Sequence, residues 1–370
     1  RLISVIPAAV AEAAMKSGAA RKKIEDLEIY KDQLSNRLDP SMSIMQGINA
    51  KIRKNLKRVI FAEGEDENML KAAIEFGRNK LGIPILIGAE NRVKEQLKKI
   101  GLDENYKIEI VNSTDKEKRE RYVKHLYKKL QREGQLERDV DRLVRNDRIA
   151  WGSSMIACKD ADAMVTGNIR HYAASIEKLK KVVNARPGEE IFGMTMIVSK
   201  GKTILVADTN VTELPSAERL INISKSCVRI ARLFGFEPKV AFLSHSTFGK
   251  PLSRNTRHVR DAIEKLKKEK VDFDFDGEMQ PDVALNPVYQ EIYPFSKIVG
   301  NANVLIMPAL HSAAISTKLM KVFGGGKNIG PLLIGLGQPI EVAPLRASTS
   351  EIINLASIAA YSSDVIDYSN

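Results

Sequence analysis

Cysteine is scarce in this sequence, and its scarcity excludes several kinds of site. Cys158 and Cys227 are the only cysteines among 370 residues, and each stands in an apolar setting. Two isolated thiols without metal-ligand spacing provide neither a disulfide framework nor a cysteine-based zinc site. We expect both to be small, reduced core residues, as in a cytoplasmic protein, and we predict no metal site.

Long apolar runs and the common nucleotide motifs are also missing. No stretch approaches the roughly 18 apolar residues of a membrane span, and no signal peptide is visible. No Gly-x-Gly-x-x-Gly follows a strand pattern, so no dinucleotide fold is predicted. The segment 272–277 begins like a calcium loop, but Val283 stands at the twelfth position where glutamate is needed. The segment 324–327 lacks the spacing and the hydroxyl residue of a phosphate-binding loop.

Charge, by contrast, is plentiful and mostly mixed in sign. The net charge is +12 and the pI about 9.4, but residues 115–148 combine 12 basic with 8 acidic side chains. Such mixing is typical of a solvated helix face, and we favour this over a nucleic-acid groove. A moderate positive charge favours an anionic small molecule, such as a phosphate or a coenzyme.

Residues 1–54 have the composition of a helical arm. Residues 7–17 show a helix pattern that starts at a proline and is closed by glycine, and residues 24–38 show a second, more polar one. Pro40 and the segment 41–47 are expected to form a link. Two short helices cannot make a core alone, so this arm must pack on another part of the protein.

From Arg58 onward, short apolar segments alternate with helical ones, which predicts an α/β protein with a parallel, doubly wound sheet. A second run begins after residues 187–188, the alternating segment 272–277 suits an edge strand, and a final helix over 350–361 must return to the first domain. The expected strands are Arg58–Ala62, Pro84–Gly88, Ala161–Gly167, Ile191–Val198, Lys202–Ala207, Lys239–Leu243, Val304–Met307 and Pro331–Ile334.

Hydroxyl groups follow the strand that ends at Leu243. Ser244, Ser246 and Thr247 lie where an open α/β sheet binds ligands, and such hydroxyls suit a phosphate. Alternatively, Ser246 and Thr247 cap the following helix. His245 alone is more often a structural histidine.

Three further places offer candidate anion ligands. Arg346 precedes the last helix, where Ser348 and Glu351 fit a capping box, and a capped helix start still suits an anion. Arg170 follows another strand end and is either a phosphate ligand or part of a surface ion pair. His311 is a candidate at the rim of a pocket.

Several blocks of sequence, in order, resemble the phosphate acetyl/butyryltransferase family from about residue 57 to residue 361. The resemblance implies two α/β/α domains with a cleft between them, as in isocitrate and isopropylmalate dehydrogenases, where coenzyme A and an acyl phosphate meet. It also implies a dimer built largely through the second domain. The blocks are Arg58–Glu67, Ala161–Gly167, Ser244–Gly249, Asp276–Asp282, Asn301–Pro308, Ile329–Gly335 and Gly335–Asn354.

We therefore expect the first domain over 55–185 plus 336–370 and the second over 186–335. The arm resembles the end of the catalytic part of bacterial NADP-dependent malic enzymes of the hybrid type, through residues 6–19 and 24–30. A chain that starts at Arg1 agrees with a domain excised from such an enzyme. For that parent, the resemblance implies oxidative decarboxylation of malate to pyruvate, with NADP and Mg²⁺ or Mn²⁺ bound upstream.

The chain departs from the family at its reactive groups. Pro344, Leu345 and Arg346 stand where the family has Ser, Arg and Gly, and Glu351 replaces the catalytic Asp. One lost oxyanion donor typically lowers a rate by about 10²–10³, so efficient acyl transfer is not expected. We predict a regulatory domain that senses acetyl-CoA or CoA, lowers malic enzyme activity and forms oligomers.

Alternatives remain open at this stage. They are an active phosphate acetyltransferase or butyryltransferase, a purely structural oligomerisation module and a nucleic-acid-binding protein. We expect no nucleic acid and no membrane as partner. The acyl group of the ligand, the sign of regulation and the oligomer beyond a dimer stay undetermined.

Overall fold

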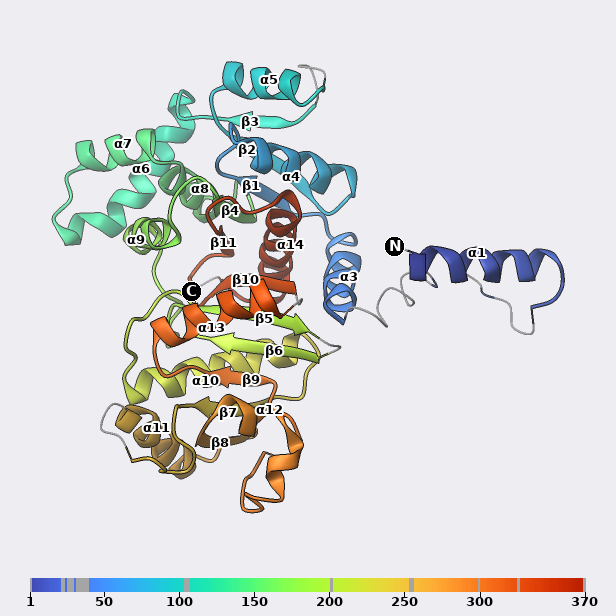
Figure 1. Ribbon diagram of the computed structural model, residues 1–370. Helices are drawn as coiled ribbons and strands as arrows, with labels where there is room; N and C mark the ends of the chain where they lie inside the picture. The colour runs from blue at the N-terminus through green and yellow to red at the C-terminus, as the bar shows by residue number, and fades with distance from the viewer. Residues whose placement is uncertain are drawn as a thin grey trace.

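Two β-sheets lie one above the other and form the body of the molecule (Figure 1). The computed structural model describes residues 2–20, 24, 30, 40–102, 107–199, 202–252, 256–298, 300–324 and 327–368. The expected helix over residues 24–38 therefore lies almost entirely outside the described residues.

The first sheet is wholly parallel, with the strand order β11-β4-β1-β2-β3. Its central strands are buried on both faces because helices cover them, which explains their continuous apolar runs. The strands are β1 (Arg58–Phe61), β2 (Ile83–Ile87), β3 (Glu109–Val111), β4 (Ala163–Gly167) and β11 (Ile340–Ala343). The helices are α4 (Glu67–Arg78), α5 (Glu90–Lys99), α6 (Lys116–Leu130), η1 (Gln131–Glu133), α7 (Glu137–Asn146), α8 (Arg148–Ala157) and α9 (Tyr172–Val182).

The second sheet is mixed, with the order β10-β5-β6-β9-β7-β8. β5 is antiparallel to both β10 and β6, whereas β6, β9, β7 and β8 run parallel. The strands are β5 (Phe192–Ser199), β6 (Lys202–Ala207), β7 (Lys239–Leu243), β8 (Asp274–Met279), β9 (Val304–Ile306) and β10 (Lys327–Ile334). The helical elements are α10 (Ala217–Leu233), α11 (Arg257–Lys268), α12 (Pro281–Leu285), η3 (Pro287–Gln290) and α13 (Leu310–Phe323).

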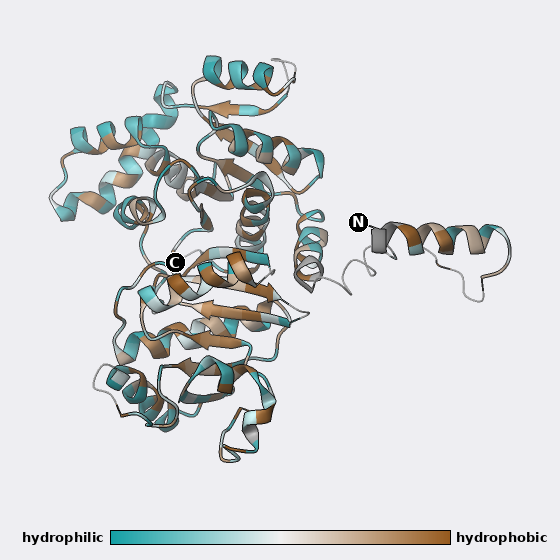
Figure 2. Ribbon diagram, in the orientation of Figure 1, coloured by the Kyte–Doolittle hydropathy of each residue, from teal (hydrophilic) through white to brown (hydrophobic). Residues whose placement is uncertain are grey.

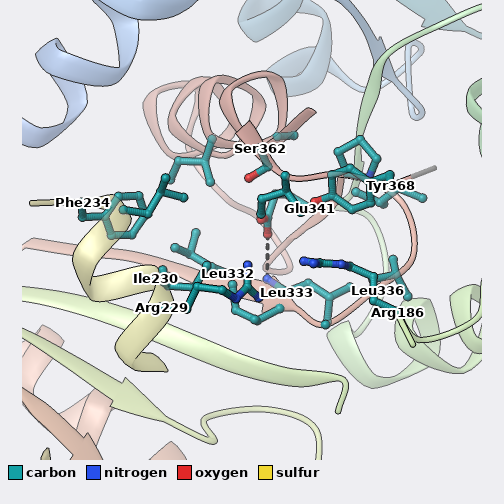
Figure 3. Close-up of a pocket in the computed structure, with 18 residues that line it drawn as sticks. Arg186, Arg229, Ile230, Phe234, Leu332, Leu333, Leu336, Glu341, Ser362 and Tyr368 are labelled. Atoms are coloured by element: carbon teal, nitrogen blue, oxygen red, sulfur yellow. Dashed lines mark hydrogen bonds between the residues drawn. The ribbon is translucent and has the colours of Figure 1, made fainter. Parts of the chain in front are cut away.

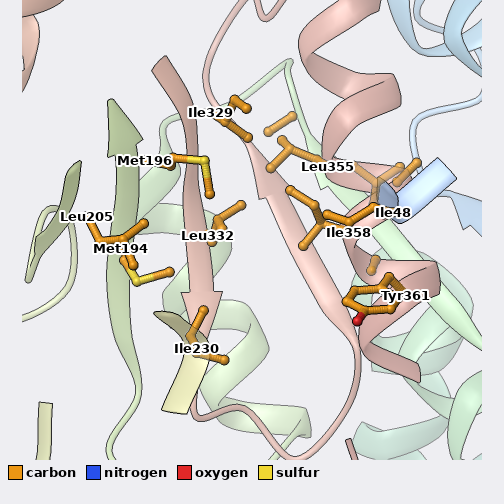
Figure 4. Packing of buried hydrophobic residues seen from close by; sticks show 14 of the residues in the cluster. Ile48, Met194, Met196, Leu205, Ile230, Ile329, Leu332, Leu355, Ile358 and Tyr361 are labelled. Carbon is orange, nitrogen blue, oxygen red and sulfur yellow. The ribbon is translucent and has the colours of Figure 1, made fainter. Parts of the chain in front are cut away.

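The last helix, α14 (Thr349–Val365), packs between the two sheets. Figure 4 shows Leu355 and Ile358 of this helix facing Ile329 and Leu332 of β10. All four belong to one apolar cluster that extends into both sheets. α14 also contacts α4 and β4 of the first sheet layer.

The arm departs from its prediction at two points. Helix α1 (Leu2–Lys16) starts earlier than expected, with Pro7 inside it, and stands apart from both sheets in Figure 1. The expected link over 40–47 is wrong, because helix α3 (Pro40–Ile52) occupies it. Proline at the first helical position is compatible with a helix, and α3 is held because Ile48 and Ile52 pack in the shared core.

The fold class is confirmed as α/β, and β8 is an edge strand as predicted. The charged segment 115–148 forms helices with mixed ion pairs, such as that of Arg119 with Asp141. In Figure 2 these helices are largely hydrophilic, whereas strands of the second sheet are largely hydrophobic. None of the helices in the described part of the chain is long and apolar enough to span a membrane.

The chain crosses between the sheets twice, and the two crossings pair with each other. The amide of Gly337 donates to the carbonyl of Asn184 at 2.8 Å, and the amide of Arg186 donates to that of Gly335 at 2.9 Å. Ala185 and Leu336 form an antiparallel bridge between them. The connection is therefore a short two-stranded ribbon.

Candidate functional site at the carboxyl ends of the first sheet

The carboxyl ends of β1, β4 and β11 meet at one edge of the first sheet, where open α/β sheets bind ligands. Gly167 at the end of β4 has a φ of 108°, and a Cβ there would lie 2.3 Å from the carbonyl oxygen of Ala343. Only glycine permits this close approach of β4 and β11. The amide of Asn168 then donates to the same carbonyl at 3.2 Å.

A buried carboxylate occupies this edge two residues after the end of β1. Glu63 is fully buried and accepts hydrogen bonds from the Thr166 hydroxyl at 3.0 Å and the Gly167 amide at 3.1 Å. Burial raises the pKa of Glu63 to about 7, and the positive charge of Arg170 opposes this shift. The carboxyl group therefore titrates near neutral pH, which is frequent in functional sites.

Arg170 is the predicted site residue nearest to this carboxylate. Its Nη2 lies 3.6 Å from Oε1 of Glu63, so it forms an ion pair, although with a buried rather than a surface partner. Its Nη1 and Oδ1 of Asn168 are both buried and have no hydrogen-bond partner among the described atoms. Buried polar atoms are normally paired, so these two atoms have hydrogen-bonding capacity that the described residues do not satisfy.

The turn over 344–346 leads from β11 into α14. Arg346 has a φ of 57°, in the left-handed region that favours glycine, and its amide donates to the carbonyl of Asn168 at 2.9 Å. The side chain of Leu345 is 45% exposed. The predicted capping box is confirmed, because Ser348 and Glu351 bond reciprocally at the start of α14.

Both carboxylate oxygens of Glu351 are engaged. Oε1 lies 2.8 Å from Nζ of Lys321 on α13, and Oε2 accepts from the amide and hydroxyl of Ser348, each at 2.9 Å. Partial burial works to raise the pKa of Glu351, but the bonds from Lys321 and Ser348 outweigh it and hold the pKa below its usual range. This contact also links the two sheet layers, since α13 covers the second sheet and α14 the first.

The predicted hydroxyl cluster is an internal network. The Ser244 and Ser246 hydroxyls lie 3.0 Å apart, and Ser246 donates to Oε1 of the buried Glu278 at 2.7 Å. Thr247 accepts from the Gln280 amide at 3.2 Å. The capping alternative is wrong, since the N-cap of α11 is Thr256. Arg260 completes the network, 3.2 Å from Glu278.

The predicted site residues thus fall into two groups that lie at different sheets. Arg170, Arg346, Ser348 and Glu351 gather around β4, β11 and α14, whereas the hydroxyl cluster bonds between β7 and β8 in the other sheet. His311 is the second residue of α13 and is exposed. Its role as a rim residue stays a prediction.

Sequence reasoning missed Glu63, Asn168 and Lys321. Glu63 carried a usable signal, because it is an acidic residue close behind the end of a buried strand. Asn168 and Lys321 carried none, because their roles depend on neighbours distant in sequence. Among the described residues, no group of three or more His, Cys, Asp or Glu side chains is arranged to hold a metal ion.

A small cavity also lies at the crossing between the sheets (Figure 3). It measures about 20 Å³, which is room for roughly one water molecule. Glu341 of β11 is buried there and accepts from the amide of Leu333 on β10 at 2.8 Å. Arg186, Arg229 and Tyr368 line the same cavity.

Comparison with known proteins decides the family. The family model described as "Phosphate acetyl/butaryl transferase" matches residues 43–360. The chain belongs to this family. It is 28% identical to a phosphotransacetylase from Streptococcus pyogenes, with a TM-score of 0.78 over 87% of this chain and 98% of that chain.

Relatives of two kinds match this chain. The chain is 30% identical over 326 residues to the phosphate acetyltransferase of Clostridium acetobutylicum, covering 86% of this chain and 97% of that relative. It is 44% identical over 362 residues to the NADP-dependent malic enzyme of Rhizobium meliloti, covering 98% of this chain and 48% of that relative. The chain thus spans about half the length of the malic enzymes that it matches, in their C-terminal part.

Proposed function

We propose that this chain is the regulatory domain of an NADP-dependent malic enzyme, and that it binds acetyl-CoA or CoA without transferring acyl groups efficiently. Under this proposal, the parent oxidatively decarboxylates malate to pyruvate and binds NADP and Mg²⁺ or Mn²⁺ outside this chain. The malic enzyme relatives that match almost the whole chain support the parentage. The two free thiols support a cytoplasmic location.

The hydrogen bonds of Glu351 are the main support for the proposal that this domain does not transfer acyl groups efficiently. A base that removes the coenzyme thiol proton needs a free carboxylate with a pKa near the working pH. Glu351 instead has both oxygens engaged by Lys321 and Ser348, and its pKa is lowered. Pro344 has no amide hydrogen and Leu345 no charge, so this turn offers little to a developing oxyanion.

Binding demands less than catalysis, and the groups for it are present. Arg170 has a buried nitrogen without a partner, and the exposed side chain of Arg346 lies near the start of α14. Cationic groups beside a helix N-terminus suit a phosphate of a coenzyme. A ligand that binds two arrangements of the sheets unequally would shift their populations and so lower malic enzyme activity.

We further propose that the domain forms a homodimer through α13. Four apolar residues spaced along this helix are strongly exposed, in one stripe. The second copy of this chain is the proposed occupant. The residues are Ile315, Leu319, Val322 and Phe323, at 58%, 52%, 74% and 82% exposure.

Two measurements on one preparation test the proposal. Calorimetric titration should detect acetyl-CoA binding at micromolar concentrations, weakened about tenfold in Arg170→Ala and unchanged in the exposed control Arg142→Ala. Formation of acetyl-CoA from acetyl phosphate and CoA should be at least about 10²-fold slower than with the Clostridium acetobutylicum relative. Absence of heat would refute sensing, whereas rapid turnover would establish the acyltransferase alternative.

A further inference from the structure

A large cavity opens at the opposite end of the first sheet, before β4 and β11 begin. Its volume is about 840 Å³, within the range of small-molecule sites. It is lined by Ala161 and Asp162 ahead of β4, by the segment 337–339 ahead of β11, and by the crossing residues 182–185. The candidate site described above lies at the other ends of these same strands, so the two places are distinct.

Positive charge gathers on one side of this cavity. His125, Lys128 and Lys129 reach it from α6, and Lys159 from the turn after α8. Two aspartates also line it, and one of them, Asp162, is already engaged because its carboxylate accepts from the backbone amide of Arg58 at 2.7 Å.

Lys129 is the most informative of these cations. Its Nζ is buried and has no hydrogen-bond partner among the described atoms. Burial lowers the pKa of Lys129, although the negative charge of Glu133 opposes the shift. A buried ammonium nitrogen without a hydrogen bond is costly, so an anionic oxygen of a ligand in the cavity would stabilise it.

Apolar side chains form another part of the lining. Ile156 and Ala157 of α8, Val182 of α9 and Ile366 beyond α14 contribute hydrocarbon surface. We propose that this cavity is a second binding site, which takes a small organic anion with a carboxylate or phosphate on an apolar body. The anionic end contacts the cations of α6, and the apolar body lies against this wall.

The proposed site adjoins the two connections between the sheets. Asn184 and Gly337 both line the cavity and are joined by a hydrogen bond of 2.8 Å, so a ligand there touches both crossings between the sheets. The proposal does not depend on acetyl-CoA binding, because its residues are different.

Calorimetric titration with phenyl phosphate and with phenylacetate tests the site and distinguishes the two anionic ends, and inorganic phosphate tests the need for an apolar body. We expect at least one aromatic anion to bind with a millimolar or lower Kd. Lys129→Met should weaken this binding about tenfold and raise the Tm of the free protein, since it removes a buried nitrogen that makes no hydrogen bond. Lys180→Met, on the exposed face of α9, should change neither.

Acetyl-CoA binding should persist in Lys129→Met, which separates this site from the proposed function. Should that variant fail to fold, Lys159→Met provides the second test, with the same expected loss. Failure of both aromatic anions to bind below about 10 mM, or unchanged affinity in the folded lysine variant, would overturn the proposal. Equally tight binding of inorganic phosphate would refute the role of the apolar wall.

Discussion

The backbone at Arg346 adopts a conformation that favours glycine. The resemblance to phosphate acyltransferases places glycine at this position, and the φ of 57° shows why glycine suits it. A side chain in the left-handed region costs about 1–2 kcal/mol, while glycine adds about 0.4–1 kcal/mol of entropy to the unfolded chain. Arginine at this position therefore lowers the stability of the folded protein slightly.

We predict that Arg346→Gly increases the free energy of unfolding by up to about 1 kcal/mol, because the relieved strain exceeds the added entropy of the unfolded chain. Urea denaturation measures this. Lys80→Gly is a positive control, since Lys80 is exposed with a φ of 53°. Arg142→Gly within α7 should instead destabilise by about 1 kcal/mol. A loss of stability in Arg346→Gly would mean that the arginine side chain stabilises the turn.

At the scale of elements, the exposed stripe of α13 makes the most direct prediction. If a second copy covers it, Val322→Asp combined with Phe323→Ser should convert the dimer to a monomer, because a buried charge at an apolar interface is unfavourable. Sedimentation velocity measures the change. Val288→Asp, at another exposed apolar residue, should leave the dimer intact. A wild-type monomer at high micromolar concentration would contradict the assignment of this surface.

Elements with a clear apolar run could be predicted from the sequence, and elements that depend on distant neighbours or contain turn-forming residues could not. β6 and β7 were predicted to the residue because their apolar runs are clear. β11 was missed because it has only four residues, contains the charged Glu341 and follows a Gly- and Pro-rich stretch that is typical of a loop. Its partner strand β4 is also distant in sequence. α3 was mistaken for a link because proline and glycine usually break helices.

The candidate site shows the same division. The capping box at Ser348 could be predicted because both partners lie within three residues. The partner of Glu351 could not, because Lys321 comes from the other sheet layer. The hydroxyls after β7 were correctly placed at a strand end, but their engagement by Glu278 depends on strand pairing that the pattern does not reveal.

At the scale of the whole molecule, the two sheets are joined where a carboxyl group is buried. Glu341 is bonded to Leu333 across the crossing, and Tyr172 and Tyr368 lie close enough for its charge to raise their pKa values further. Arg186 and Arg229 line the same cavity as Glu341, but they form ion pairs with Glu189. Burial therefore dominates and raises the pKa of Glu341 from 4.5 to about 8.

This shift makes stability depend on pH in a definite direction. Between pH 4.5 and about 8 the folded protein holds a proton on Glu341 that the unfolded chain releases, so stability falls as pH rises through this window. Glu63, with a pKa of about 7, adds to the same trend. Glu341→Gln, which stays neutral and keeps an oxygen acceptor for Leu333, should reduce the loss of stability between pH 5.5 and 8 in urea denaturation. Glu264→Gln, on the exposed face of α11, should preserve it. A slope unchanged by Glu341→Gln would show that Glu341 is ionised in the folded protein throughout this range.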